Sequence, residues 1–174
     1  MKVLSSKTVF TSRKFSVIQN TIERNGKTFT KDFIQRNPVV LVIPYEGNTI
    51  YMESQFRDAL GGLSLEIVSG NMEKGFSTLE NAKRELKEET GLTAETWHHL
   101  ADWELSVSMD AKIHVFAATD LKKGKAHLDY DEEITLVKMS LDEVFEKIRN
   151  GEMKAASHIA SLFLFKQLQE EGKL

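Results

Sequence analysis

Residues 84–89, Arg-Glu-Leu-Lys-Glu-Glu, place three carboxylates and one guanidinium within two turns of a predicted helix. At 100° per residue, with Arg84 at 0°, Glu88 falls at about 40°. Glu85 and Glu89 follow at about 100° and 140°, so the three acids share one stripe. Hard cations such as Mg²⁺ bind carboxylate oxygens, which makes the stripe a candidate metal site. The alternative, favoured for a charge run taken alone, is a solvated face with Arg84 paired to Glu88.

Two capping boxes and one amphipathic pattern predict three helices. Ser77 and Glu80 form an S-x-x-E capping box before the acidic stripe, and Gly91 suits the position after a helix end. Ser140 and Glu143 form a second box, opening a helix that should stop near residue 151. A final amphipathic helix is expected to turn Ile159, Leu162, Phe163 and Leu168 toward the core.

The rest of the pattern predicts strands. Asn25-Gly26 is typical of a two-residue hairpin turn, and residues 39–43 form a short apolar run closed by Pro44. Further strands are expected at 49–56, 63–68, about 100–119 and 133–139. The order of strands, helix, strands and helices favours an α+β fold, an α/β/α sandwich on a mixed sheet. Its length of 174 residues suits one domain.

Composition excludes several classes of protein. The net charge of −3 gives no long-range case for binding nucleic acid or an anionic membrane. The absence of cysteine excludes disulfides, thiolate zinc sites and a cysteine nucleophile. The five histidines are dispersed without metal-site spacing. Without a signal peptide or a long apolar run, we expect a cytoplasmic protein.

The segment from Gly70 to Leu92 resembles the Nudix box, G-x5-E-x7-R-E-U-x-E-E-x-G-U, where U is aliphatic. Eight of its nine defined positions match, and Phe76 stands where the box has its first Glu. The resemblance implies the Nudix α/β/α sandwich and a Mg²⁺- or Mn²⁺-dependent hydrolase of nucleoside diphosphate derivatives. Phe76 implies fewer metals or a weakened site, unless the nearby Glu73 substitutes.

The resemblance also implies roles for the residues of the box. Glu85 and Glu89 would ligate the metal, with Glu88 as a further ligand or an acid–base group. Arg84 would orient a glutamate. Just before the box, residues 65–70 resemble the L-E-x-P-A-G segment of the ADP-ribose pyrophosphatase branch, in which the Ser69 carbonyl corresponds to a backbone metal ligand.

Features outside the box resemble the same branch and imply a substrate site. Arg57 would contact phosphates, Glu66 would lie near substrate or metal, and Glu132 or Glu133, with Glu132 preferred, would be the catalytic base. Residues 1–37 correspond to an N-terminal β segment that reaches a partner subunit, which predicts a homodimer with the catalytic core at 38–174. Aromatic side chains of this segment could stack on the base, and Phe33 is the one assigned to substrate, although core packing is the common alternative.

The implied function is metal-dependent hydrolysis of the diphosphate bond of ADP-ribose or a related nucleoside diphosphate sugar. Its products would be a nucleoside monophosphate and a sugar phosphate. Ala111 falls where the branch has a Glu near the distal half of the substrate, which leaves the substrate less defined than the chemistry. Two alternatives stay open: a catalytically weak Nudix domain that senses a nucleotide, and a Nudix enzyme for another nucleotide substrate.

Overall fold

The structure, a computed structural model, describes residues 1–128, 130 and 133–174. Contacts divide the chain into two compact units. Unit 1 comprises Met1–Pro38 and Trp103–Ile113, and unit 2 comprises Val39–Asp102 and His114–Leu174. The prediction of a single domain, with an N-terminal segment ending near residue 37, stays a prediction.

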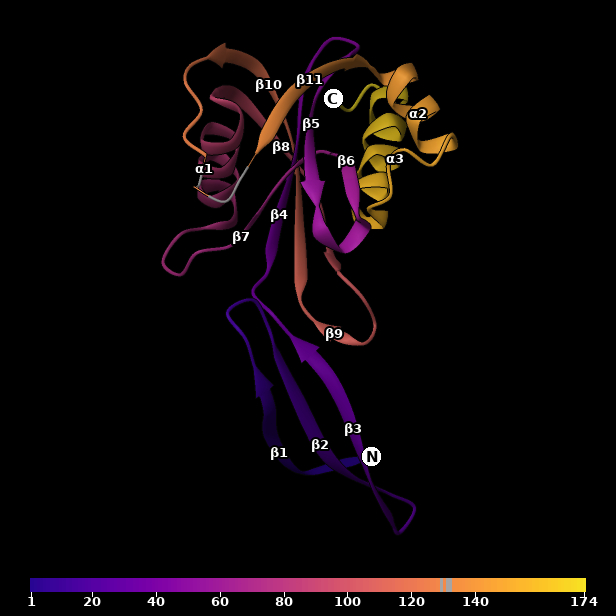
Figure 1. Cartoon of the computed structure of the whole chain (residues 1–174). Helices are drawn as coiled ribbons and strands as arrows, with labels where there is room; N and C mark the ends of the chain where they lie inside the picture. The colour runs from indigo at the N-terminus through magenta and orange to yellow at the C-terminus, as the bar shows by residue number, and fades with distance from the viewer. Residues whose placement is uncertain (129, 131–132) are drawn as a thin grey trace. The chain divides into compact units, whose positions relative to one another are not determined.

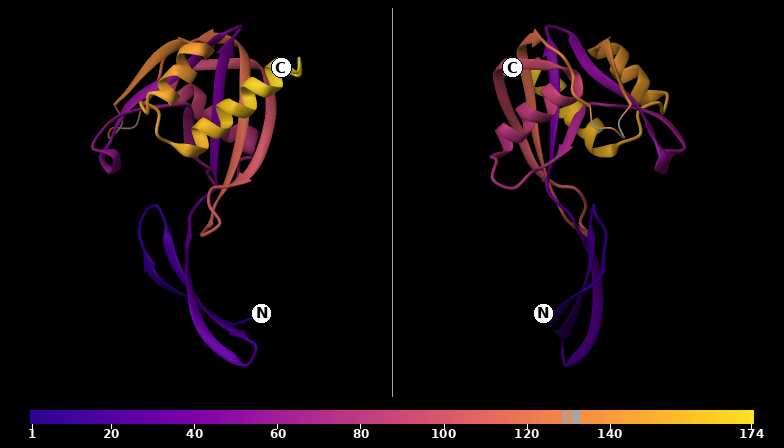
Figure 2. Two further views of the ribbon diagram at one scale, coloured as in Figure 1. Left: turned by 90° about the vertical axis from the view of Figure 1, so that its right-hand side faces the viewer. Right: turned by 60° about the vertical axis from the view of Figure 1, so that its left-hand side comes forward.

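Unit 1 is built on an antiparallel β meander. It contains β1 (Lys2–Thr11), β2 (Ser16–Arg24), β3 (Lys27–Gln35) and the short β9 (Met109–Asp110), hydrogen-bonded in the order β1-β2-β3-β9. Figure 2 shows the three long strands as a continuous twisted ribbon. Asn25 and Gly26, with φ of 53° and 72°, form the predicted two-residue turn between β2 and β3. All of β1 is exposed to solvent.

The larger sheet belongs to unit 2, apart from the last two residues of β8 and the first two of β10. Within the described residues its strands are β4 (Val39–Glu46), β5 (Thr49–Arg57), β6 (Gly62–Glu66), β7 (Val68–Asn71), β8 (Leu92–Glu104), β10 (Lys112–Lys123) and β11 (Ile134–Ser140). The order is β11-β5-β4-β10-β8, while β6 pairs with β5 and β7 pairs with β4. A single 3-10 turn, η1 (Asp58–Leu60), lies in the β5–β6 connection.

Helices cover both faces of this sheet. The helix α1 (Thr78–Thr90) contacts β4 and β7, whereas α2 (Leu141–Arg149) contacts β11 and β5, and α3 (Ala156–Glu170) contacts β4. Figure 1 shows α1 on one side of the sheet and the α2–α3 pair on the other. This arrangement confirms the predicted α+β sandwich with an N-terminal antiparallel segment.

The central strand β4 explains how one sheet supports two cores. Val40 and Val42 belong to the apolar cluster against α1, together with Leu86. Side chains alternate along a strand, so Leu41 and Tyr45 face the other way. Tyr45 meets Phe165 of α3 at a ring distance of 4.9 Å. Both faces of β4 are therefore buried, as its continuous apolar run predicts.

The predicted helix caps are confirmed. Both capping boxes are formed, at Ser77 and at Ser140. Gly91 ends α1 with a φ of 72°, and a Cβ at this position would lie 2.7 Å from the Ala126 nitrogen. Gly91 is thus required both for its backbone conformation and for the close approach of residues 124–126, which follow β10.

Other predicted details were wrong. β4 runs through Pro44 to Glu46, where it forms its hairpin with β5. On α3 the buried residues are His158, Ser161, Leu162 and Phe165, while Phe163 is exposed and packs edge-on against Phe145. The apolar pattern predicted the wrong side of α3 as buried, because two of the buried positions are occupied by a small Ser and a His rather than by apolar residues. In the described part of the chain, no helix is long and apolar enough to cross a membrane.

Candidate functional site

Two buried carboxylates of α1 converge on one dipeptide of β7. The carboxyl carbon of Glu85 lies against Gly70 so closely that a Cβ there would stand 1.9 Å from it. One turn later, Glu89 accepts a hydrogen bond of 3.3 Å from the Ser69 backbone nitrogen. Gly70 is therefore required for its lack of a side chain, because any Cβ would fill the space of the Glu85 carboxylate.

Arg84 forms ion pairs with the acidic side chains around it on the exposed side of α1. Its guanidinium donates to Glu85 at 2.6 Å and to Glu88 at 2.5 Å. Glu73, in the loop before α1, lies 3.5 Å from it. Burial lowers the pKa of Arg84, but the charges of these acids outweigh burial and raise it. Among the described residues, no three His, Asp or Glu side chains form a group that could hold a metal ion. Two of the predicted metal ligands, Glu85 and Glu88, are instead paired with Arg84.

Arg57 and Glu66 form a bidentate ion pair across the β5–β6 hairpin, in which Arg57 ends β5 and Glu66 ends β6. Nε and Nη2 of Arg57 donate to the two carboxylate oxygens of Glu66 at 2.9 and 2.6 Å. These bonds, together with the charges of Glu66, Glu89 and Glu53, raise the pKa of Arg57 despite burial. Burial raises the pKa of Glu66, but Arg57 outweighs it, so the carboxyl has a pKa below its usual value. The Arg57 side chain is 41% exposed, so a ligand can reach it.

Sequence reasoning missed a buried acid in the same place. Glu53 is fully buried on β5, directly opposite Glu66 in the β5–β6 register. Like charges facing one another across two strands destabilise a sheet. Arg57 is the cation whose charge acts on both, and on Glu89 of α1. The alternation along β5 was the available signal, since it puts Glu53 on the same face as Arg57.

His158, at the start of α3, was also missed. Its Nδ1 accepts a hydrogen bond of 3.3 Å from the Ile67 backbone nitrogen, between Glu66 and Val68. The side chain is therefore neutral, with its proton on the other ring nitrogen. Burial lowers the pKa of His158 to about 4; the carboxylate of Glu66 opposes this shift and Arg57 adds to it. His158 thus fixes the backbone between β6 and β7 that carries Glu66 and leads to Ser69.

The buried imidazole predicts a loss of stability in mild acid. Its folded-state pKa of about 4 lies below the unfolded value of 6.5, so the unfolded chain binds more protons between these pH values. Stability should be complete above pH 6.5 and fall toward pH 4, by about 2 kcal/mol between pH 7 and 5. Urea unfolding at both pH values measures this. His158→Gln should remove most of the difference, and His127→Gln, at an exposed position, should retain it.

Asn81 organises the loop that leads into α1. Fully buried, it accepts a hydrogen bond from the Glu73 backbone nitrogen at 2.9 Å and donates to the Ser77 carbonyl at 2.9 Å. It also donates to the carbonyl of Phe76, whose side chain is 49% exposed. The loop therefore presents the Glu73 carboxylate to Arg84 and leaves Phe76 in solvent.

A carboxylate at position 76 should compensate for the loss of the one at position 73. Glu73→Gln removes a charge partner of Arg84 and is expected to lower kcat/KM about tenfold, as for groups that orient metal ligands. Adding Phe76→Glu should restore most of the activity, because it returns a carboxylate to the same loop. Kinetics of the two single variants and the double variant measure the coupling. Equal losses with and without Phe76→Glu would contradict it.

Described residues on both sides of the predicted acidic segment make backbone contacts with unit 2. Before it, the His127 backbone nitrogen donates to the Glu88 carbonyl at 2.8 Å, and Gly124 donates to that of Gly91 at 2.8 Å. After it, Ile134 opens β11 opposite Gln55, two residues before Arg57. Glu133 is exposed at this junction. Glu132, the preferred base, lies outside the described residues.

Two predicted positions belong to unit 1. Phe33 lies on β3, half-buried and paired with Ile18 of β2. Ala111 is buried beside Lys112, after β9. Phe33 remains a predicted substrate contact. The remaining predicted residues described by the structure, apart from Glu133, come together in unit 2 around the β7–α1 segment and the β5–β6 hairpin.

Comparison with known proteins identifies the class. The model of the NUDIX domain family matches residues 35–161, which include all of the acidic helix and the Arg57–Glu66 pair. The chain belongs to the Nudix family. This confirms the family predicted from the box between Gly70 and Leu92.

Individual relatives cover nearly the whole chain. The ADP-ribose pyrophosphatase of Bacillus subtilis strain 168 is 32% identical in sequence to this chain, and the alignment covers 98% of this chain and 100% of the relative. The methanol dehydrogenase activator of Bacillus methanolicus is 30% identical, over 99% and 95%. A crystal structure of an ADP compounds hydrolase superposes with a TM-score of 0.85 over 99% of this chain and 96% of the other, at 23% identity. That structural match confirms the fold.

Proposed function

We propose that this Nudix protein hydrolyses the diphosphate bond of ADP-ribose or a related nucleoside diphosphate sugar, using Mg²⁺ or Mn²⁺. The products would be a nucleoside monophosphate and a sugar phosphate. The main structural support is the convergence of buried Glu85 and Glu89 on the Ser69–Gly70 backbone, with Arg57 held nearby by Glu66. The name of the B. subtilis relative supports the substrate class.

The donor set fits a hard divalent cation. Glu85 and Glu89 supply buried carboxylate oxygens one helical turn apart, and the Ser69 carbonyl belongs to the backbone that both approach. Two buried like charges at this spacing gain from a counter-ion. Glu88 would join when its carboxylate leaves Arg84. When bound, the metal would neutralise the diphosphate and lower the pKa of a water molecule.

The side chains of this chain supply the remaining steps of the proposal. Arg57 would donate to a phosphate oxygen, with Glu66 holding the guanidinium in orientation. Arg84 would set the positions of Glu85 and Glu88. The proton of the attacking water would go to Glu132 or Glu133.

A release assay over nucleotide sugars tests this function. With Mg²⁺ present, we expect turnover of ADP-ribose or a related member of a panel that also holds nucleoside triphosphates and dinucleoside polyphosphates. The products should be a nucleoside monophosphate and a sugar phosphate, seen by chromatography. Turnover confined to triphosphates would assign another Nudix substrate.

A catalytically weak nucleotide-binding domain is the second candidate. The observation that favours it is the solvent-exposed Phe76 at the position where the box has a carboxylate. This candidate predicts tight binding of ADP-ribose by calorimetry without turnover at saturating Mg²⁺ or Mn²⁺. Rapid product release would exclude it.

We also propose a homodimer and expect about twice the chain mass of 19.8 kDa in light scattering. Strand β1 supports this, because it is an edge strand and leaves Val3, Leu4, Val9 and Phe10 exposed. Replacing Val9 and Phe10 by Ser should shift the mass toward the monomer. A monomeric wild type at micromolar concentration would contradict the proposal. Cytoplasmic localisation stays a prediction.

A further inference from the structure

Unit 1 contains a pocket of about 460 Å³, built entirely from its own residues. Three segments form its walls: residues 12–16 at the β1–β2 turn and the start of β2, residues 35–38 from the end of β3, and residues 110–112 where β9 ends and β10 begins. The volume lies within the range of small-molecule sites. None of the Nudix-box residues lies in its walls.

Hydrogen bonds fix these walls before any ligand binds. The Ser12 hydroxyl donates to the Phe15 carbonyl at 3.0 Å and accepts from the Lys14 and Phe15 nitrogens. Strands β3 and β9 pair in parallel, and the Arg36 nitrogen donates to the Asp110 carbonyl at 3.2 Å. Three segments separated in sequence are thus held as one surface, which reduces the entropy that ordering them around a ligand would cost.

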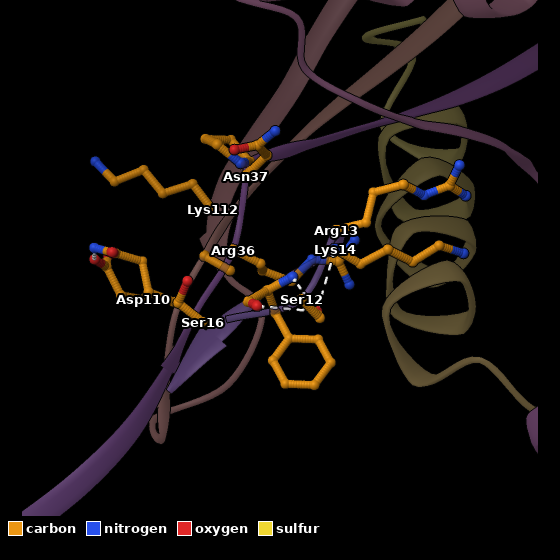
Figure 3. Close-up of a pocket in the computed structure, with 12 residues that line it drawn as sticks. Ser12, Arg13, Lys14, Ser16, Arg36, Asn37, Asp110 and Lys112 are labelled. Carbon is orange, nitrogen blue, oxygen red and sulfur yellow. Dashed lines mark hydrogen bonds between the residues drawn. The ribbon is translucent and has the colours of Figure 1, made fainter. Parts of the chain in front are cut away.

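The charge of the pocket is opposite to that of the chain. Its lining includes four cationic residues, Arg13, Lys14, Arg36 and Lys112. One carboxylate, that of Asp110, opposes them, and it already accepts a hydrogen bond of 2.8 Å from the Gln35 amide. Figure 3 shows Arg13 and Lys14 extending from the turn on one side of the pocket and Lys112 on the other. A positive site of this kind, in a protein of net charge −3, concentrates small anions locally.

We propose that this pocket binds a phosphomonoester group, either as free phosphate or on a nucleotide. A phosphomonoester carries close to two negative charges at pH 7, and guanidinium groups match its oxygens in geometry. A nucleic acid is a poor match, because a pocket of this volume suits one small ligand and the chain as a whole is acidic. The proposal does not depend on hydrolysis at the Nudix helix.

Binding by the intact wild-type chain tests the proposal directly. In EDTA at pH 7, ¹H–¹⁵N NMR titrations would compare inorganic phosphate, AMP and adenosine. We expect saturating shifts at residues 12–16, 35–37 and 110–112 with phosphate and with AMP, and none with adenosine. Equal affinities would assign the phosphoryl group alone, and tenfold tighter AMP would assign a nucleotide. Absent shifts in these segments, or equal binding of adenosine and AMP, would overturn the proposal.

Paired charge variants assign the binding to the pocket. Lys14→Gln with Arg36→Gln should raise the Kd for phosphate at least tenfold. Arg24→Gln with Lys27→Gln, at the exposed turn of the same unit, should change it less than twofold. Lys112→Gln, which alters a different wall, gives a second reading if the first pair unfolds the chain in thermal melts. Glu85→Gln should leave the Kd unchanged, so failure of the Nudix activity would not be mistaken for failure of this site.

Discussion

Glu85→Gln is expected to abolish most of the hydrolytic activity while leaving the fold intact. Glu85 is buried, contacts Gly70 and receives a hydrogen bond from Arg84. The amide keeps the shape and can still accept that bond, but it removes the anionic ligand proposed for the metal. Losing a ligand worth several kcal/mol of transition-state stabilisation should lower kcat/KM on the order of 1000-fold.

The stability of this variant should change little, because two effects oppose each other. Removing the charge of Glu85 weakens its pair with Arg84 and also relieves repulsion from Glu89, one turn along α1. We expect the free energy of unfolding to stay within about 1 kcal/mol of wild type. Glu146→Gln, an exposed change on α2, is the matched control and should alter neither quantity. Turnover at the wild-type rate by Glu85→Gln would contradict the metal-site proposal.

Features encoded within a few neighbouring residues could be predicted from the sequence. The Asn25-Gly26 turn, the two capping boxes and the Gly91 helix end depend on contacts made within one turn of chain. Helical spacing places the carboxylates of α1 on one side of the helix, and the resemblance to the Nudix box is what made them a candidate metal site. Their shared stripe follows from counting residues.

The partners of those carboxylates depend on pairings between distant segments. Glu53 became part of the site only through the register that sets it opposite Glu66. His158 reaches Ile67 across 91 positions of sequence. Local propensity does not encode such a contact. From the sequence alone, an acid or a histidine within an apolar run is equally consistent with a surface position. Sequence reasoning therefore identified the acids and Arg84 of α1, together with Arg57 and Glu66, but not Glu53 and His158.

The backbone of β7 makes Gly70 the second sensitive position. A Cβ at this residue would lie 1.9 Å from the Glu85 carboxyl carbon and 2.1 Å from one of its oxygens. Gly70 does not have a positive φ, so alanine is compatible with the local backbone and only the side-chain contact is at stake. Gly70→Ala thus tests the position of one carboxylate.

We expect Gly70→Ala to lower kcat/KM about 100-fold and the free energy of unfolding by about 1 to 3 kcal/mol. The methyl group must displace Glu85 from β7, and overpacking a filled site has that typical energetic cost. A carboxylate moved by about 1 Å loses most of its catalytic value. Gly62→Ala is the control, because a Cβ there meets nothing within 4 Å and its φ is not positive. Steady-state kinetics and urea unfolding give the two quantities.

The double variant separates this mechanism from general damage to the sheet. If Gly70→Ala acts through Glu85, then adding it to Glu85→Gln removes nothing further from catalysis, since the carboxylate is already gone. The double variant should therefore match Glu85→Gln in kcat/KM, although it is less stable. Additive losses would mean that Gly70 serves the site in another way, for instance through the neighbouring Ser69 carbonyl. Non-additivity would place Gly70 and Glu85 in one functional unit, with the strand and the helix meeting where the cation is proposed to bind.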